Sequence, residues 1–187
     1  VIVPNGGDKE AEAMARECMA ERAAQLGIAN SPATLATAYQ RNDGGFSVVR
    51  FQQTLDGVPV YGSDIAVSVK ADGEVIFVSS EARPSIEAIP LQPARDADDV
   101  RKQVVQVFGT PSAADVLAPR LMVYADTQPT RLAWVYVIRD AQKAGEWEIV
   151  ADAGSGEILD YRNTEYYVDG TATVFDPDPL TTATATY

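Results

Sequence analysis

The residue types that most often carry out catalysis are scarce in this chain. Its 187 residues include no histidine and one cysteine, Cys18, but 27 aspartates and glutamates. Without histidine, neither a Ser-His-Asp triad nor a His-Glu-x-x-His zinc site can form within these residues. Carboxylates remain, and they either bind calcium or magnesium or hydrolyse glycosidic bonds in pairs.

The carboxylates do not gather into a recognisable site. Asp176-Pro177-Asp178-Pro179 looks like a calcium loop but lacks the regular acidic spacing and the terminal glutamate of an EF-hand. Most other acids fall in predicted turns, helix caps and strand faces. We therefore predict that the chain is not an enzyme and holds no metal or cofactor of its own. Two buried acids facing one cleft would instead indicate a carboxylate enzyme.

The charge and hydropathy of the chain limit its partners. A net charge of −12 disfavours nucleic acid and anionic lipid, because both bind basic surfaces. No apolar run approaches the ~20 residues of a membrane-spanning helix. The chain begins with Val1. We expect that a signal peptide has been removed and that the protein is secreted or periplasmic.

The elements that would position a site fall into two parts of similar order. In the first part, Asp8 is a predicted N-cap of a helix over residues 8–26, with Cys18 on its apolar face and Gly27 as its stop. Four strands follow, separated by turns rich in aspartate and glycine. These strands are predicted at 34–41, 46–54, 58–70 and 74–80.

The second part begins after an extended, semi-rigid linker, predicted from the three prolines within residues 84–94. Asp96 or Asp98 caps a second helix, and Gly109 ends it. The predicted fold class is therefore α+β, with two small cystatin-like units, each one helix packed on an antiparallel sheet. The strands of the second unit are predicted at 120–125, 132–139, 146–151 and 157–163.

The most distinctive motif joins the second and third predicted strands. Asp56-Gly57 is a tight-turn dipeptide suited to positive φ, and Pro59 fits the start of a strand. Gly62 then interrupts the register of the third strand. The pattern resembles the propeptide domain of fungalysin and thermolysin type zinc metalloproteases. The residues that carry this resemblance are Phe51, Gln53, Gly57, Pro59, Val60 and Gly62.

A second motif lies about ninety residues further on. Its strand-turn-strand pattern resembles the PepSY domain, which in metalloprotease precursors lies between the first propeptide domain and the catalytic domain. A single such turn is ordinary turn chemistry, but here it follows the first motif in the family's order. The matching residues are Trp134, Trp147, Asp152, Ala153, Gly156 and Ile158.

Together the two resemblances divide the chain into a propeptide domain at 1–83, the linker at 84–94 and a PepSY-like domain at 95–167. Residues 168–187 are then a junction tail toward a catalytic domain. Tyr167, Val168, Val174 and Phe175 are the candidate cleft or junction residues of this region.

The resemblance also implies a function. The chain is expected to act as an intramolecular chaperone and cleft-blocking inhibitor of a secreted zinc metalloprotease, with the cognate thermolysin-like protease domain as partner. Zinc and calcium are expected only in that protease domain. The alternative is a stand-alone secreted or envelope module that regulates a protease in trans.

The motif residues have structural roles that compete with protease contact. Large apolar residues on strands are usually buried, so we expect core packing for Phe51, Val60, Trp134 and Trp147. Gln53 is different, because a polar side chain among apolar strand residues needs a hydrogen-bond partner. We expect that partner to be either a local backbone group or the protease.

Overall fold

The computed structural model describes residues 6–110, 112–140 and 145–165. The predicted junction residues Tyr167, Val168, Val174 and Phe175 lie outside the described residues. The described part is α+β, as predicted, with two helices and a mostly antiparallel sheet of eight strands. The elements are α1 (Gly6–Glu21), β1 (Thr34–Asp43), β2 (Phe46–Leu55), β3 (Val58–Lys70), β4 (Val75–Ser80), α2 (Ala97–Phe108), β5 (Ala114–Tyr124), β6 (Arg131–Arg139), β7 (Glu146–Asp152) and β8 (Ile158–Asn163).

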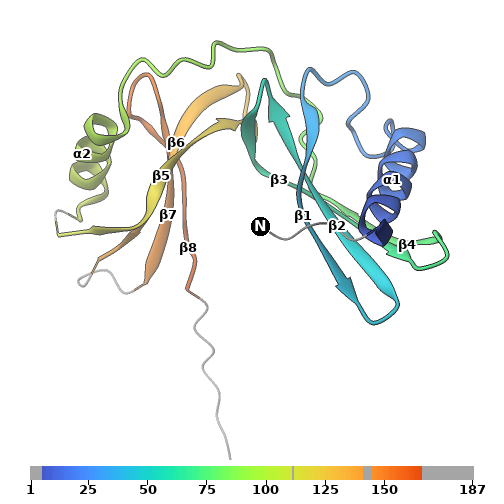
Figure 1. The fold of residues 1–187 in the computed structure, drawn as a ribbon. Coiled ribbons are helices and arrows are strands. Elements are labelled where there is room, and N and C mark those ends of the chain that lie inside the picture. The colour runs from blue at the N-terminus through green and yellow to red at the C-terminus, as the bar shows by residue number, and fades with distance from the viewer. Residues whose placement is uncertain (1–5, 111, 141–144, 166–187) are drawn as a thin grey trace, which may run out of the picture.

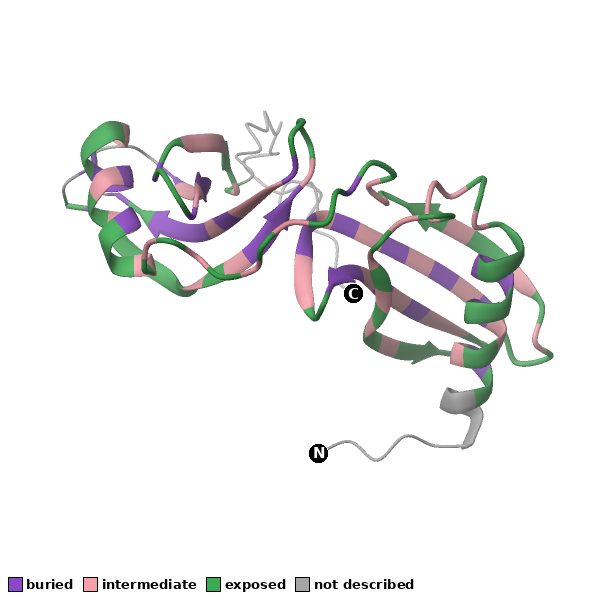
Figure 2. Ribbon diagram, turned by 90° about the horizontal axis from the view of Figure 1, so that it is seen from above, coloured by how far each residue is buried: buried purple, intermediate pink, exposed green. Residues whose placement is uncertain are grey.

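The first half of the structure, α1 to β4, packs one helix on one face of four antiparallel strands (Figure 1). Alternate residues of β3 are buried, as its period-two pattern predicts, and Figure 2 shows this alternation along the strands. The core between helix and sheet contains Ala11, Ala15 and Met19 of α1 and Val49, Phe51, Ile65, Val67 and Val69 of the sheet.

The helix α1 starts and ends earlier than predicted. It begins at Gly6, so Asp8 lies inside it rather than at its cap. It ends at Glu21, after which residues 22–27 form turns, with backbone bonds that mix three- and four-residue spacings. Gly27, the predicted stop, lies six residues after the end of α1 and closes these turns instead. Gly27 has φ +71°, and the Ile28 N–H donates to the Ala23 carbonyl in a Schellman-type closure.

The second half packs α2 on β5 to β8 in the same manner. Asp96 is the N-cap, and its side chain accepts a hydrogen bond from the Asp99 N–H, which decides between the two predicted caps. Gly109 ends the helix with φ +74°, as predicted. The core beneath the helix is made of Val100, Val104, Ala113, Tyr136, Ile138, Ile149 and Ala151.

Strand β5 begins six residues before the predicted start at residue 120. Pro119 disfavours a strand at this point, because proline cannot donate to a sheet ladder. The structure accommodates it with a register shift between Leu117 and Arg120, so that Pro119 occupies an irregular position where no ladder bond is required.

The two halves meet within one sheet, in the strand order β1-β2-β3-β5-β6-β7-β8, with β4 pairing β3 on the side. The junction is a single parallel pair between Val60 of β3 and Val123 of β5. Figure 1 shows the sheet bending at this junction, with α1 and α2 on the outer flanks. The sequence did not predict this continuity, and the cystatin-like description of two units stays a prediction.

The proline-rich segment between β4 and α2 contains neither helix nor strand, and it bonds to the connection between β5 and β6. The Glu87 N–H donates to Thr130 Oγ1 at 3.0 Å, and the Gln128 side chain donates to the Ser85 carbonyl at 2.6 Å. Ile86 is buried with Leu55, Val60 and Val123, in a cluster that contains residues of both halves. The segment therefore packs across the junction of the halves rather than spanning open solvent.

The Asp56-Gly57 turn gives a clean test of backbone conformation. Asp56 and Gly57 have φ of +45° and +88°, and a Cβ added at Gly57 would meet no atom within 4 Å. Gly57→Val should therefore lower the free energy of unfolding by about 1–3 kcal/mol through backbone strain alone. Gly57→Asn should cost less, because asparagine tolerates the left-handed region. Urea titrations of both variants measure the difference, and equal costs would contradict this explanation.

Candidate functional site

The first motif surrounds a break in the β2–β3 ladder. Gln52 pairs with Asp64, but the next paired position joins Thr54 to Pro59, so residues 60–63 leave the ladder. The side chain of Ser63 bridges the gap: its Oγ accepts from the Gln53 N–H at 3.1 Å and donates to the Val60 carbonyl at 2.9 Å. The break frees Val60 to pair with β5.

Gln53 finds its hydrogen-bond partner in the backbone of this chain. Its side chain is 1% exposed and lies against the start of the proline-rich segment. The Arg83 N–H donates to Gln53 Oε1 at 2.6 Å, and Gln53 Nε2 donates to the Arg83 carbonyl at 3.2 Å. The amide thus pairs with Arg83 as a neighbouring strand would.

Gly62 and the Arg83 side chain are matched to each other. Gly62 has φ +65°, and a Cβ built on it would lie 2.7 Å from Arg83 Nη2. The Arg83 guanidinium passes over this glycine to form an ion pair with Asp126, beyond the end of β5, and also donates to the Glu81 carbonyl at 2.9 Å. Glycine is needed here both for its conformation and for the space it leaves.

Tyr61, between Val60 and Gly62, reaches into the second half. Its ring is 6% exposed and packs with Met122, Tyr124 and Val135. Its hydroxyl donates to Glu148 Oε1 on β7 at 2.7 Å. Burial, followed by the hydrogen bond to the Glu148 carboxylate and its negative charge, raises the pKa of the Tyr61 phenol.

Glu148 is a buried carboxylate, 7% exposed, with cationic partners. Arg162 Nη2 lies 2.7 Å from Glu148 Oε1, and Arg120 Nη2 lies 3.2 Å from Glu148 Oε2. The Arg162 guanidinium also lies over the Tyr61 ring, 5.7 Å from its centroid. The carboxylate is therefore satisfied by one hydroxyl and two guanidiniums, which offsets the cost of burying its charge.

The other residues of the first motif face inward. Phe51 is fully buried against α1, with the Arg16 guanidinium 5.0 Å from its ring centroid. Val60 is fully buried in the cluster shared by the two halves, and Pro59 begins β3 opposite Thr54. The motif residues are thus gathered around the ladder break and its two cores.

The second motif supports the turn between β7 and β8. Asp152 Oδ1 accepts from the Gly154 and Ser155 N–H groups, both at 2.8 Å. Gly156 has φ +81° and lies so close to Arg95 and Gln103 that an added Cβ would be 2.5 Å from Gln103 Oε1. The Trp134 indole, from the other part of the motif, donates to the Arg95 carbonyl at 3.0 Å.

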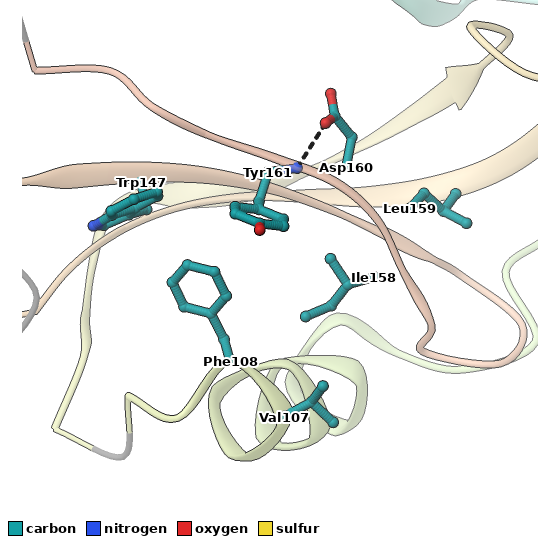
Figure 3. A pocket seen from close by; sticks show the side chains of 7 residues that line it. All are labelled: Val107, Phe108, Trp147, Ile158, Leu159, Asp160 and Tyr161. Atoms are coloured by element: carbon teal, nitrogen blue, oxygen red, sulfur yellow. Dashed lines mark hydrogen bonds between the residues drawn. The ribbon is translucent and has the colours of Figure 1, made fainter.

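Trp147 lines an aromatic pocket between α2 and β8. Figure 3 shows its ring beside those of Phe108 and Tyr161, with Ile158 and Val107 completing the apolar wall. The centroid of the Phe108 ring lies 5.5 Å from the centroid of the Trp147 ring and 5.4 Å from that of the Tyr161 ring, and both pairs meet edge to face. The pocket measures about 680 Å³. Asp160 is its only acidic lining residue, so the pocket suits apolar side chains rather than acid–base catalysis.

Neither motif assembles an acid, a base and a nucleophile. Across residues 6–110, 112–140 and 145–165, no three aspartate, glutamate or cysteine side chains are grouped to hold a metal ion. Within the same ranges, neither helix has the length and apolar character required to cross a membrane.

Sequence reasoning missed the polar residues that connect the two halves. Tyr61 lies between the motif residues Val60 and Gly62, yet a tyrosine on a strand does not indicate which residue its hydroxyl bonds to. Glu148 and Arg162 face each other in the β7–β8 register, so opposite charges on two correctly aligned strands were a usable signal. Arg83 and Asp126 lie in connecting segments, where no periodicity predicts a contact.

The class of protein follows from comparison with known families. Residues 38–82, which contain the ladder break and its surroundings, match the Fungalysin/Thermolysin Propeptide Motif. The chain carries the propeptide motif of the fungalysin and thermolysin type proteases, as the sequence resemblance predicted.

Individual relatives agree with this class. The chain is 32% identical over 134 residues to the thermostable neutral protease NprT of Geobacillus stearothermophilus, covering 66% of this chain and 24% of that protein. It is 30% identical over 133 residues to thermolysin of Alicyclobacillus acidocaldarius subsp. acidocaldarius, with the same two coverages. It is 25% identical over 146 residues to the transglutaminase-activating metalloprotease of Streptomyces mobaraensis, covering 75% of this chain and 19% of that protein.

The chain thus spans about a quarter of the length of the first two relatives. Among solved structures, it is similar to the Bacillus megaterium YpeB C-terminal domain. That likeness has a TM-score of 0.44 at 15% identity and covers 89% of this chain and 69% of that one.

The Gln53 side chain should be required for stability. Gln53→Leu removes both partners of the Arg83 backbone and should lower the free energy of unfolding by about 1–3 kcal/mol, the cost of leaving buried polar groups unpaired. Gln53→Glu keeps the acceptor for the Arg83 N–H and should cost less at low pH, where the carboxyl is protonated, than at pH 7. Denaturant titrations at pH 4 and pH 7 measure this, and a neutral Gln53→Leu would contradict the assigned role.

Alkaline pH should destabilise the fold through Tyr61. Its pKa is raised in the folded state, whereas an unfolded tyrosine has a pKa of about 10. The stabilisation is therefore fully present below pH 10 and declines as pH rises further, by up to about 1.4 kcal/mol per pH unit for one tyrosine. Tyr61→Phe should make this decline less steep. Unfolding titrations between pH 8 and pH 11 test it, and identical slopes would refute the contribution of Tyr61.

Proposed function

We propose that this chain is the propeptide region of a thermolysin-like zinc metalloprotease precursor, acting as an intramolecular chaperone and cleft-blocking inhibitor. The observation that carries the proposal is the match of residues 38–82 to the fungalysin/thermolysin propeptide motif. Alignment with thermolysin-type proteins over 66% of the chain supports it. The partner is the cognate protease domain, and the site of action is outside the cytoplasm, as expected for a secreted protease.

The domain division belongs to the same proposal. Residues 1–83 form the fungalysin/thermolysin-type unit and 95–167 the PepSY-like unit, each cystatin-like, with 84–94 between them. Residues 168–187 lead toward the catalytic domain. The packing of α1 on β1–β4 and of α2 on β5–β8 supports this division.

The chaperone role is kinetic in origin. A protease that is trapped behind a high folding barrier gains from a template that binds its late folding intermediate and is afterwards removed. A template must itself be ordered before its partner. Two helix-on-sheet cores joined by a shared apolar cluster supply such an ordered body.

The inhibitory role requires a surface but no catalytic residue, which suits a chain without histidine. An extended segment can pair through its backbone with a strand that lines a protease cleft. The candidate cleft residues Tyr167, Val168, Val174 and Phe175 follow β8, which ends the strand order of the described sheet. We assign contact with the cleft to this region.

The motif residues have a supporting role in this proposal. Phe51, Val60 and Gln53 are buried, and Gly57, Pro59 and Gly62 shape the turn and the ladder break. Trp134, Asp152 and Gly156 do the same around the β7–β8 turn. Trp147 lines the aromatic pocket between α2 and β8, so we assign a protease-facing role to it among the motif residues.

The experiment is inhibition in trans. The purified chain should inhibit the thermolysin-like catalytic domain encoded with it, or thermolysin itself as a substitute probe, and should raise the yield of active protease on refolding. Truncation after Glu165 keeps the bonds from Thr164 to Glu146 and should leave the unfolding transition unchanged while raising Ki. Refolding yield and Ki are measured with a peptide substrate.

Two results would change the assignment. If the truncated chain inhibits as tightly as the full chain, the contact surface lies on the folded halves and not on the C-terminal segment. If neither form affects any thermolysin-like protease, the stand-alone binding module replaces the propeptide as the better account.

A further inference from the structure

The backbone connection between the two halves is too small to fix their relative angle. One parallel pair, Val60 with Val123, joins the strands of the two halves. A single pair acts as a pivot, because a sheet resists rotation only when several ladder positions share the load. The apolar cluster of Leu55, Val60, Ile86 and Val123 adds cohesion. Hydrophobic packing is non-directional and does not by itself select one angle.

Two polar contacts also join the two halves near this pair. Tyr61, from β3, donates its hydroxyl to Glu148 on β7 at 2.7 Å. Arg83, from the segment after β4, forms an ion pair with Asp126, between β5 and β6. We call Tyr61, Glu148, Arg83 and Asp126 the joint. Each pair takes one residue from either half, and hydrogen bonds are directional, so the joint selects one angle.

In each pair, one residue is held in place by further hydrogen bonds or ion pairs. Glu148 is buried and is held in addition by Arg120 and Arg162, so the acceptor for Tyr61 cannot reorient freely. The Arg83 backbone is held by the side chain of Gln53, and its guanidinium also donates to the Glu81 carbonyl. One member of each pair, Glu148 or Arg83, is thus held by residues of its own half.

We propose that Tyr61 and Arg83 are positioning residues that fix the angle between the two halves and thereby preorganise the chain for binding the protease. This inference rests on the proposed function for its second part. In this proposal the propeptide motif does more than stabilise the first half, because its residue Tyr61 also orients the second half. Tyr61 and Arg83 act through the angle, not through contact with the protease.

Loss of the joint should weaken inhibition without removing any contact residue. A partner that binds both halves at once recognises only the chains that hold the correct angle. If that fraction falls to about a tenth, Ki rises about tenfold. The change should appear mainly in the association step, because the correctly angled molecule still makes every contact.

The experiment measures the angle and the inhibition in the same variants. Tyr61→Phe with Arg83→Met removes both polar links while it keeps the ring, the aliphatic stem and the Gln53 bonds to the Arg83 backbone. Spin labels on Glu17→Cys in α1 and Gln106→Cys in α2, both exposed, report the distance between the halves in a Cys18→Ala background. Far-UV circular dichroism confirms that the helices and strands persist. Ki is measured against thermolysin or the catalytic domain encoded with the chain.

Matched variants separate positioning from general destabilisation. Tyr39→Phe with Arg41→Met makes the same two chemical changes on exposed residues of β1, away from the joint. It should leave the distance distribution and Ki unchanged. Tyr61→Phe with Arg83→Lys restores a cation facing Asp126 and should recover part of the narrow distribution.

A broadened distance distribution together with a higher Ki in the joint variant supports the proposal. An unchanged distribution overturns the joint, whatever the inhibition shows. A broadened distribution with unchanged Ki overturns the link from angle to binding. If the wild-type chain inhibits no thermolysin-like protease, the proposed function fails, and the distance measurement still decides whether the joint fixes the angle.

Discussion

The structure depends on one interruption in the hydrogen-bond ladder between β2 and β3. Residues 60–63 leave the ladder, and the backbone groups freed there must find other partners because unpaired buried polar groups are costly. Ser63 satisfies Val60 and Gln53, the Gln53 amide takes up the backbone of Arg83, and Val60 pairs with β5. In a regular hairpin, the backbone of Val60 would stay paired with β2 and would not be free to pair with β5. The break therefore provides the backbone pairing that connects the core under α1 with the core under α2.

Much of the architecture was predictable from local chemistry. Period-two apolar patterns placed β2, β3, β6 and β7 closely. Gly109 marked the end of α2, because a left-handed residue closes a helix, whereas α1 ends six residues before Gly27. The start of β5 was not predictable, since Pro119 argues against a strand and its register shift is a property of the pairing. The single sheet was also missed. Alternation along a strand says which face is buried, but not which distant strand lies alongside.

For the candidate site, the sequence located the positions but not their partners. The motif residues around Gln53 and Gly62 lie together at the ladder break, and their need for turns or hydrogen bonds followed from residue type. Tyr61, Arg83 and Glu148 were missed because each acts across the two halves, at separations that no local pattern spans. Local sequence patterns do not indicate contacts between distant parts of one chain, just as they do not indicate contacts with another protein. Comparison with known families supplied the class, and the geometry supplied the division of tasks within it.

The hydrogen bond from Tyr61 to Glu148 joins residues 87 positions apart. Its formation closes a long loop, and the entropy lost in closing such a loop places the contact late in folding. During synthesis from the N-terminus, α1 and β1–β4 emerge first. The apolar surfaces of Val60 and Tyr61 stay exposed to solvent until β5 and β7 have been made. The first half is therefore complete only after the second has been made. The link between the two halves therefore depends on a strand, β3, that contributes residues to the cores of both.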